Sequence, residues 1–159
     1  LNAEYNTPDY SCITHQQTDN PDFYKLHGGM PDRYTKYNTT IRQVWWNDET
    51  LKQQLGDLLG IYVVSISAIE QPPGQTIPIH QDHFYKIRTQ FPDDPRTRVR
   101  ANIFLEDWKI GHFLQYDDVV DSHWKQGDGH MWDSDVLHIG ANNGMQNKFT
   151  LQVSGFFNN

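Results

Sequence analysis

From residue 61 to its end, the chain alternates apolar and polar positions with the period of two that is typical of half-buried β-strands. The alternation is clearest in segment 148–157, where Phe149, Leu151 and Val153 share one face and Lys148, Thr150 and Gln152 share the other. The pattern predicts strands at 61–69, 98–105, 111–116, 119–125, 129–132, 135–139 and 148–157. Residues 75–85 are expected to be extended, and 88–97 to form an exposed loop.

One segment has the period of a helix instead. Between residues 48 and 59, four leucines recur at i, i+4, i+7 and i+8, which predicts one apolar helix face. These residues are Leu51, Leu55, Leu58 and Leu59. Asn47 or Asp48 can cap the start of this helix, and Gly60 stands where a left-handed residue would end it.

The order of these elements predicts a mainly β fold. Short strands at this spacing favour a β-sandwich or barrel, with the helix packed outside it. Residues 1–40 have no clear period, and we expect loops with short strands there, followed by a strand at 41–46. We predict a single domain over 1–159, in which residues 1–60 pack on a β core formed by 61–157.

Charge and composition narrow the function classes. The formal net charge is -7, which disfavours binding to a nucleic-acid backbone. No apolar run approaches the roughly 18 residues that a membrane span needs, and the start shows no signal-peptide pattern. The single cysteine, Cys12, excludes an internal disulfide and a cysteine-based zinc site within this sequence. We therefore expect a cytoplasmic protein with neither nucleic-acid nor membrane partners.

A candidate metal site lies in the sequence His80-Gln81-Asp82. In an extended segment, residues i and i+2 point to the same face, so the imidazole and the carboxylate would converge. A third ligand is needed, and His138 at the end of a short apolar segment is the best candidate. Two histidines and one carboxylate on one side of an ion are typical of non-haem Fe(II) oxygenases.

With these residues in place, the chain resembles the 2-oxoglutarate- and Fe(II)-dependent oxygenases over roughly residues 61–157. The resemblance rests on the order of several motifs, none of which is specific alone. They are Pro73-Gly74, His80-Gln81-Asp82, a strand that ends in Glu106-Asp107, His138, and Lys148-Phe149-Thr150. The resemblance implies a double-stranded β-helix, a cupin-like jelly roll, with the metal at its open end.

The same resemblance implies a hydroxylase that uses Fe(II), 2-oxoglutarate and O2, releases succinate and CO2, and has ascorbate as a candidate accessory reductant. Its catalytic metal ligands would be His80, Asp82 and His138. Lys148 and Thr150 would bind the far carboxylate of 2-oxoglutarate. The family usually has Arg at the position of Lys148, which offers a point charge rather than a two-pronged grip.

A second pair of residues competes for the role of anchor. Arg98, Arg100 and Asn102 alternate along one face of a predicted strand. If that face points inward, Arg100 or Asn102 could bind the oxoacid's carboxylate or the substrate. The substrate is not readable from the sequence: a protein side chain, a peptide or an amino-acid-like small molecule would each fit.

Two other functions remain open at this point. A metal-dependent cupin enzyme that does not use 2-oxoglutarate would account for Gly74, His80, His138 and Asn142, although its second histidine would be replaced by Asp82. A non-enzymatic jelly-roll binding module would account for the aromatic residues. It would leave the joint arrangement of histidines, aspartate and lysine unexplained.

Overall fold

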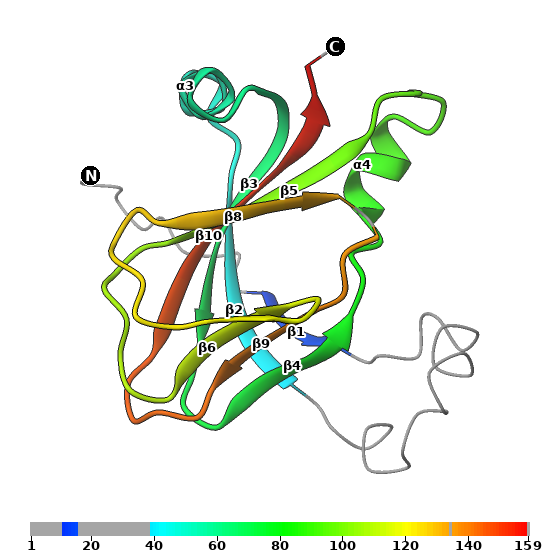
Figure 1. Cartoon of the computed structure of the whole chain (residues 1–159). Coiled ribbons are helices and arrows are strands. Elements are labelled where there is room, and N and C mark those ends of the chain that lie inside the picture. Colours follow the sequence, from blue (N-terminus) through cyan, green and yellow to red (C-terminus); the bar gives the residue numbers. More distant parts are fainter. Residues whose placement is uncertain (1–10, 16–38, 134, 159) are drawn as a thin grey trace, which may run out of the picture.

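Two antiparallel sheets form the frame of the protein in a computed structural model that describes residues 11–15, 39–133 and 135–158 (Figure 1). The larger sheet has the strand order β1-β2-β3-β10-β5-β8, and the smaller has the order β4-β9-β6-β7. The strands of the larger sheet are β1 (Ser11–His15), β2 (Thr39–Trp46), β3 (Ile61–Gln71), β5 (Arg98–Phe104), β8 (Gly129–Asp133) and β10 (Lys148–Phe157). Those of the smaller sheet are β4 (Gln75–His80), β6 (His112–Tyr116), β7 (Val119–Asp121) and β9 (His138–Asn142). Two helices, α3 (Glu49–Leu59) and α4 (Tyr85–Gln90), complete the described elements.

The chain crosses repeatedly between the two sheets. It passes from β3 to β4, from β5 to β6, from β8 to β9 and back to β10, and each of these steps changes sheet. This strand connectivity is that of a jelly roll, so the predicted mainly β fold is confirmed. None of the helices in the described ranges is long and apolar enough to cross a bilayer.

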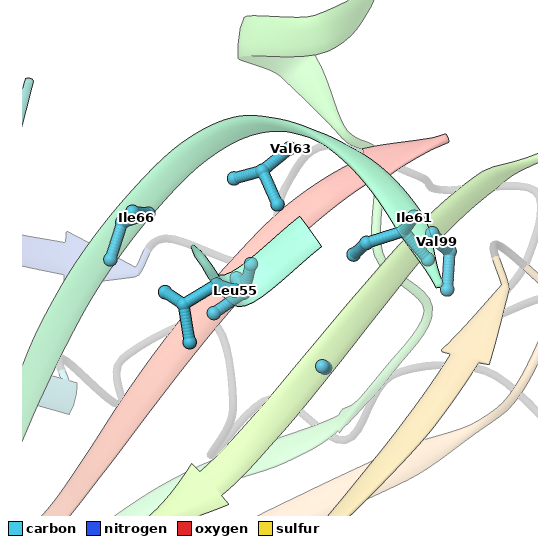
Figure 2. Packing of buried hydrophobic residues seen from close by; sticks show 7 residues of the cluster. Leu55, Ile61, Val63, Ile66 and Val99 are labelled. Atoms are coloured by element: carbon cyan, nitrogen blue, oxygen red, sulfur yellow. The ribbon is translucent and has the colours of Figure 1, made fainter. Parts of the chain in front are cut away.

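The helix α3 covers the outer face of the larger sheet. Asp48 caps its start by accepting a hydrogen bond from the Leu51 amide at 3.0 Å, and Gly60 ends it at a φ of 69°. The side chains beneath α3 come from β3, β5 and β10 and surround Leu55 (Figure 2). This cluster consists of Leu55, Ile61, Val63, Ile66, Val99, Ala101 and Val153.

Because neighbouring strand residues alternate in direction, the other face of β5 points between the sheets. Its Phe104 stacks on Trp124 with ring centroids 3.8 Å apart and packs with Leu114 of the smaller sheet. A second internal cluster joins Val64 and Phe156 to Phe84 and Ile87 of the α4 region. The face that carries Arg100 and Asn102 is therefore the inner face.

Several boundaries differ from the predictions. Residues 85–90 form helix α4 rather than the end of an extended segment and the start of a loop, because Phe84 turns the chain at a φ of 49° and is buried with Ile87. The strand predicted at 119–125 ends at Asp121, since Trp124 leaves it to stack inside the fold. The strand predicted at 135–139 begins at His138 and runs to Asn142.

The apolar face of α3 is also narrower than predicted. Leu58 is 76% exposed, whereas Leu51 and Leu59 pack against the cluster around Leu55. The helix approaches β3 most closely at Gly56, where an added Cβ would lie 2.8 Å from the carbonyl oxygen of Ile61. Gly56 therefore faces β3, and Leu58, about 200° further around the helix, points away from the sheet.

Two leucines of one helix therefore make a matched test of the packing. Leu55→Ala removes a buried side chain and should lower the free energy of unfolding by about 2–5 kcal/mol. Leu58→Ala should change it by no more than about 0.5 kcal/mol, because the side chain is already in solvent. Urea denaturation of both variants measures the difference, and equal losses would contradict this packing.

Candidate metal centre

His80, Asp82 and His138 lie together between the two sheets. Each offers one ligand atom, and these atoms all lie within 4.8 Å of one another. His80 and His138 are directly opposite on β4 and β9, with ring centroids 4.1 Å apart. Among the described residues, this is the one group of three or more metal-ligating side chains with such spacing. The structure thus brings the three residues predicted as metal ligands together.

The route by which His80 reaches this position was not predicted. The register of β4 against β9 is regular up to Ile77, shifts, and resumes at His80. Without the shift, the period of two would turn Ile79 inward and His80 outward; instead Ile79 is 41% exposed. Asp82 follows in the short connection between β4 and α4 rather than in a strand. The two side chains converge because of an irregularity, not because of regular strand geometry.

Asp82 is held by two donors from the larger sheet. Arg100 of β5 forms an ion pair with Oδ1, and the indole Nε1 of Trp132 in β8 donates to Oδ2 at 3.0 Å. Burial alone would raise the pKa of Asp82, but the Arg100 guanidinium, the two imidazoles and the Trp132 hydrogen bond hold it below its ordinary value. The carboxylate is therefore ionised at neutral pH and fixed in direction.

His138 is prepared to act as a neutral ligand. Its Nδ1 donates to the carbonyl oxygen of Val136 at 3.2 Å, which directs the lone pair of Nε2 to the centre, 3.8 Å from Oδ2 of Asp82. Burial lowers the pKa of His138, against the opposing effect of the Asp82 charge. Two imidazole nitrogens and one carboxylate suit a divalent transition metal such as Fe(II), so the donor set fits the ion implied by the sequence.

Lys148 lies further along the same interior. It is 4% exposed, its ammonium donates to the carbonyl oxygen of Phe113 at 2.8 Å, and its Nζ lies 5.6 Å from the centroid of the Trp124 ring. Burial lowers its pKa to about 7, partly offset by the charge of Asp121. In the described residues, no carboxylate oxygen forms a salt bridge with it. Lys148 is a buried cation without an anionic contact.

A glycine of β9 is close to both Lys148 and His138. Gly140 is two residues from His138 on β9, and a Cβ added there would lie 3.9 Å from Nζ of Lys148. Gln71 is opposite Lys148 on β3 and donates to the carbonyl oxygen of Gly140 at 2.9 Å. Neither Gln71 nor Gly140 was predicted as a site residue, because a glutamine and a glycine in strands have no distinctive spacing.

The remaining predicted site residues also point inward. Thr150 is buried beside Lys148 on β10. Asn102 is buried on β5, and its Oδ1 accepts no hydrogen bond from the described residues. Arg100, a candidate anchor for the oxoacid, instead contacts Asp82 and also donates from Nε to the Ser154 hydroxyl at 3.1 Å. Trp132, which the sequence analysis missed, completes the support of the carboxylate.

Comparison with known proteins identifies the fold but no family. No protein-family model matches the sequence, and a search of curated proteins finds no match. Among solved structures, a Pseudomonas putida prolyl-4-hydroxylase superposes with a TM-score of 0.51 and 20% identity, over 76% of this chain and 73% of that one. A predicted oxalate decarboxylase from Thermotoga maritima gives a TM-score of 0.50 and 13% identity, over 75% and 83% of the two chains.

These two likenesses, with the strand order, establish a cupin-like jelly roll. The two solved structures are named for different activities, so the fold alone does not determine the reaction. The choice must come from the residues of the site.

The trio of His80, Asp82 and His138 predicts how Mn(II) affinity responds to substitution. Mn(II) titrated by calorimetry should bind the wild type at one site, and His80→Ala, Asp82→Ala and His138→Ala should each weaken it by more than the roughly 10- to 100-fold that loss of an outer hydrogen-bond partner costs. Trp132→Phe removes such a partner of Asp82 and should fall within that range.

His83→Ala is the matched control, because His83 is adjacent to Asp82 but exposed and outside the trio. Its Mn(II) affinity should equal that of the wild type. Unchanged affinity in all three alanine variants of the trio would exclude this site.

Proposed function

We propose that this chain is a non-haem Fe(II)- and 2-oxoglutarate-dependent dioxygenase that hydroxylates a C–H bond of a protein side chain or an amino-acid-like substrate. One observation carries the proposal: a buried lysine without an anionic contact shares the interior with a two-histidine, one-carboxylate trio, and a glycine lies between them. Metal binding alone would not require Lys148.

His80, Asp82 and His138 would hold the iron, which supplies the activation of O2 when it is bound. The balance of the reaction is that one oxygen atom enters the substrate C–H bond and the other enters succinate, while CO2 leaves 2-oxoglutarate. The protein's contribution is to hold the three ligands on one side, so that positions for the oxoacid and O2 stay open. Arg100 and Trp132 keep Asp82 ionised and directed inward.

The spacing along β9 supports a cosubstrate of the length of 2-oxoglutarate. Residues of a strand rise by about 3.3 Å each, so Gly140 lies roughly 7 Å along β9 from His138. That is about the length of a five-carbon dicarboxylate, whose far carboxylate would then reach the Lys148 ammonium. The absence of a side chain at Gly140 leaves that path open.

The side chains around Lys148 favour the binding of a carboxylate because they exclude water from it. Trp124 and Phe104 form a stacked wall next to Lys148, which strengthens a charge-assisted hydrogen bond by excluding solvent. The Thr150 hydroxyl lies on the same strand face as Lys148 and can donate to the same carboxylate. Asn102 Oδ1 accepts no hydrogen bond from the described residues, so it could accept one from a donor group of a ligand in the interior.

The activity test is direct. With Fe(II), O2 and ascorbate, the protein should convert 2-oxoglutarate to succinate in equimolar amounts with CO2, slowly without substrate and faster with it. Succinate is measured by mass spectrometry, and Asp82→Ala serves as the inactive control. If iron is bound but no succinate forms and 2-oxoglutarate does not bind, a metal-dependent cupin enzyme of another kind becomes the better description.

Lys148→Met tests the anchor separately from the metal. The change keeps the stem and removes the charge, and loss of one partner of a buried charge pair costs about 2–5 kcal/mol. Since about 1.4 kcal/mol is tenfold, 2-oxoglutarate affinity should fall roughly 30-fold or more while Mn(II) affinity stays the same. Lys125→Met is the control, because the Lys125 side chain is 76% exposed.

The same anchor predicts a pH dependence with a definite sign. The pKa of Lys148 without ligand is about 7, and a bound carboxylate would raise it. Below pH 7 the anchor is already protonated, so affinity should be constant. Above pH 7, ligand binding requires uptake of a proton, and affinity should fall by about tenfold per pH unit until the raised pKa is reached. A flat profile between pH 6 and 9 would contradict a titrating Lys148 anchor.

A further inference from the structure

A cavity of about 340 Å³ opens beside the candidate metal centre. It lies where β6 of the smaller sheet approaches β8 at the edge of the larger sheet. Aromatic and aliphatic side chains of Tyr116, Trp132, Val136 and Phe157 make much of its lining. This volume is at the small end of the range for ligand pockets and suits one side chain or one small molecule.

The cavity shares residues with the support of the metal ligands. Trp132 contributes to its wall and donates to Oδ2 of Asp82, and its ring centroid lies 4.8 Å from that of His138. Tyr116 is directly opposite His138 across β6 and β9, and the carbonyl of Val136 binds Nδ1 of His138. A molecule in the cavity would therefore be next to the metal ligands, on a different side from Lys148, which contacts Phe113 and Trp124.

The charges around the cavity have one sign. Asp117 and Asp133 belong to its lining, and no lysine or arginine does among the described residues. The lining also contains His130, whose Nε2 is engaged by the carboxylate of Asp121 at 2.5 Å. An anionic group entering the cavity would approach two aspartates with no lysine or arginine in the described lining, whereas a cationic group would find both carboxylates and aromatic faces.

We infer that the cavity binds an organic cation, an ammonium or guanidinium group carried on a short apolar stem, and that this group identifies the substrate class of the proposed dioxygenase. The aromatic faces of Tyr116 and Trp132 attract a cation and also pack against methylene groups. With the charge at the carboxylates, the stem would lie along the wall that Trp132 shares with the metal centre. The C–H bonds of the stem, rather than the charged group, would then be those that are oxidised.

Three tripeptides with the same backbone test this inference: acetyl-Gly-X-Gly-amide with X as lysine, norleucine or glutamate. Dissociation constants are measured by saturation-transfer NMR with the full chain loaded with Zn(II), a diamagnetic ion that imidazole ligands bind. The lysine probe should bind at least about fivefold more tightly than the norleucine probe, and the glutamate probe most weakly. Equal affinity of the lysine and norleucine probes, or tighter binding of the glutamate probe, would overturn the inference.

Variants locate the effect. Asp117→Asn with Asp133→Asn should remove the preference for lysine over norleucine, whereas Asp118→Asn should keep it, because Asp118 is in the same turn but outside the lining. Asparagine is compatible with the left-handed φ of 49° at Asp117, and at Asp133 it retains the oxygen that accepts from the Asp135 amide at 2.9 Å. If the double variant does not fold, the two single variants are compared with Asp118→Asn in the same way. An equal loss in Asp118→Asn would indicate diffuse surface charge and overturn the assignment to the cavity.

This inference rests on the proposed function for its reaction, and a second readout separates the two. Mn(II) in place of Zn(II) should broaden the side-chain protons of the bound lysine probe, because they would lie near the metal. Preferential lysine binding without succinate formation would leave the cavity assignment intact and contradict the dioxygenase. Succinate formation with no preference for lysine would support the dioxygenase and contradict the cavity assignment. Preferential lysine binding without paramagnetic broadening would show that the cavity is not part of the active site.

Discussion

A single buried carboxylate connects the two sheets. Asp82 follows a strand of the smaller sheet, yet both of its hydrogen-bond donors, Arg100 and Trp132, come from the larger one. A buried carboxylate is tolerated only when it is paired and hydrogen-bonded, and here the pairing also fixes the direction of the group. Because His80 and His138 come from the smaller sheet, the contact of Asp82 with the larger sheet makes the trio a joint product of both.

Lys148, in the same interior, is a buried charged group without a partner of opposite charge among the described residues. Lys148 is buried as deeply as Asp82, but it has a carbonyl oxygen and an aromatic ring as neighbours instead of a carboxylate. Burial of an unpaired ammonium is unfavourable, which is why its pKa is lowered. A dicarboxylate that reaches it from the metal would supply the missing charge, and the strain of the unliganded state would then contribute to affinity.

Parts of this organisation could be predicted from sequence because they follow from regular periods. The alternation in 98–105 put Arg100 and Asn102 on one strand face, and that in 148–157 put Lys148 and Thr150 on one face, but only the structure shows that the face of Arg100 and Asn102 points inward. The caps of α3 fixed its ends. The trio was predicted as well, but for a partly wrong reason. The register shift before His80 reverses the alternation, and nothing in the local pattern of hydrophobic residues indicates it.

Other features depended on tertiary contacts that no local pattern contains. The helix α4 forms because Phe84 and Ile87 find a cluster with Val64 and Phe156, which are distant in sequence. Leu58 is exposed because Gly56 faces β3 and Leu58 lies about 200° around the helix from it. Trp132 would read as a core aromatic from sequence, and only its 3.0 Å hydrogen bond to Asp82 connects it with the metal centre.

The central claim is that one interior binds both a metal and a dicarboxylate anchored by Lys148. The most direct measurement is a crystal structure of the full chain grown without oxygen in the presence of Fe(II) and 2-oxoglutarate, with anomalous scattering recorded at the iron edge. The account predicts one iron peak bounded by His80, Asp82 and His138, and an oxoacid that chelates it and extends past Gly140 to the ammonium of Lys148. Iron at another position, or an oxoacid whose far carboxylate does not contact Lys148, would contradict it.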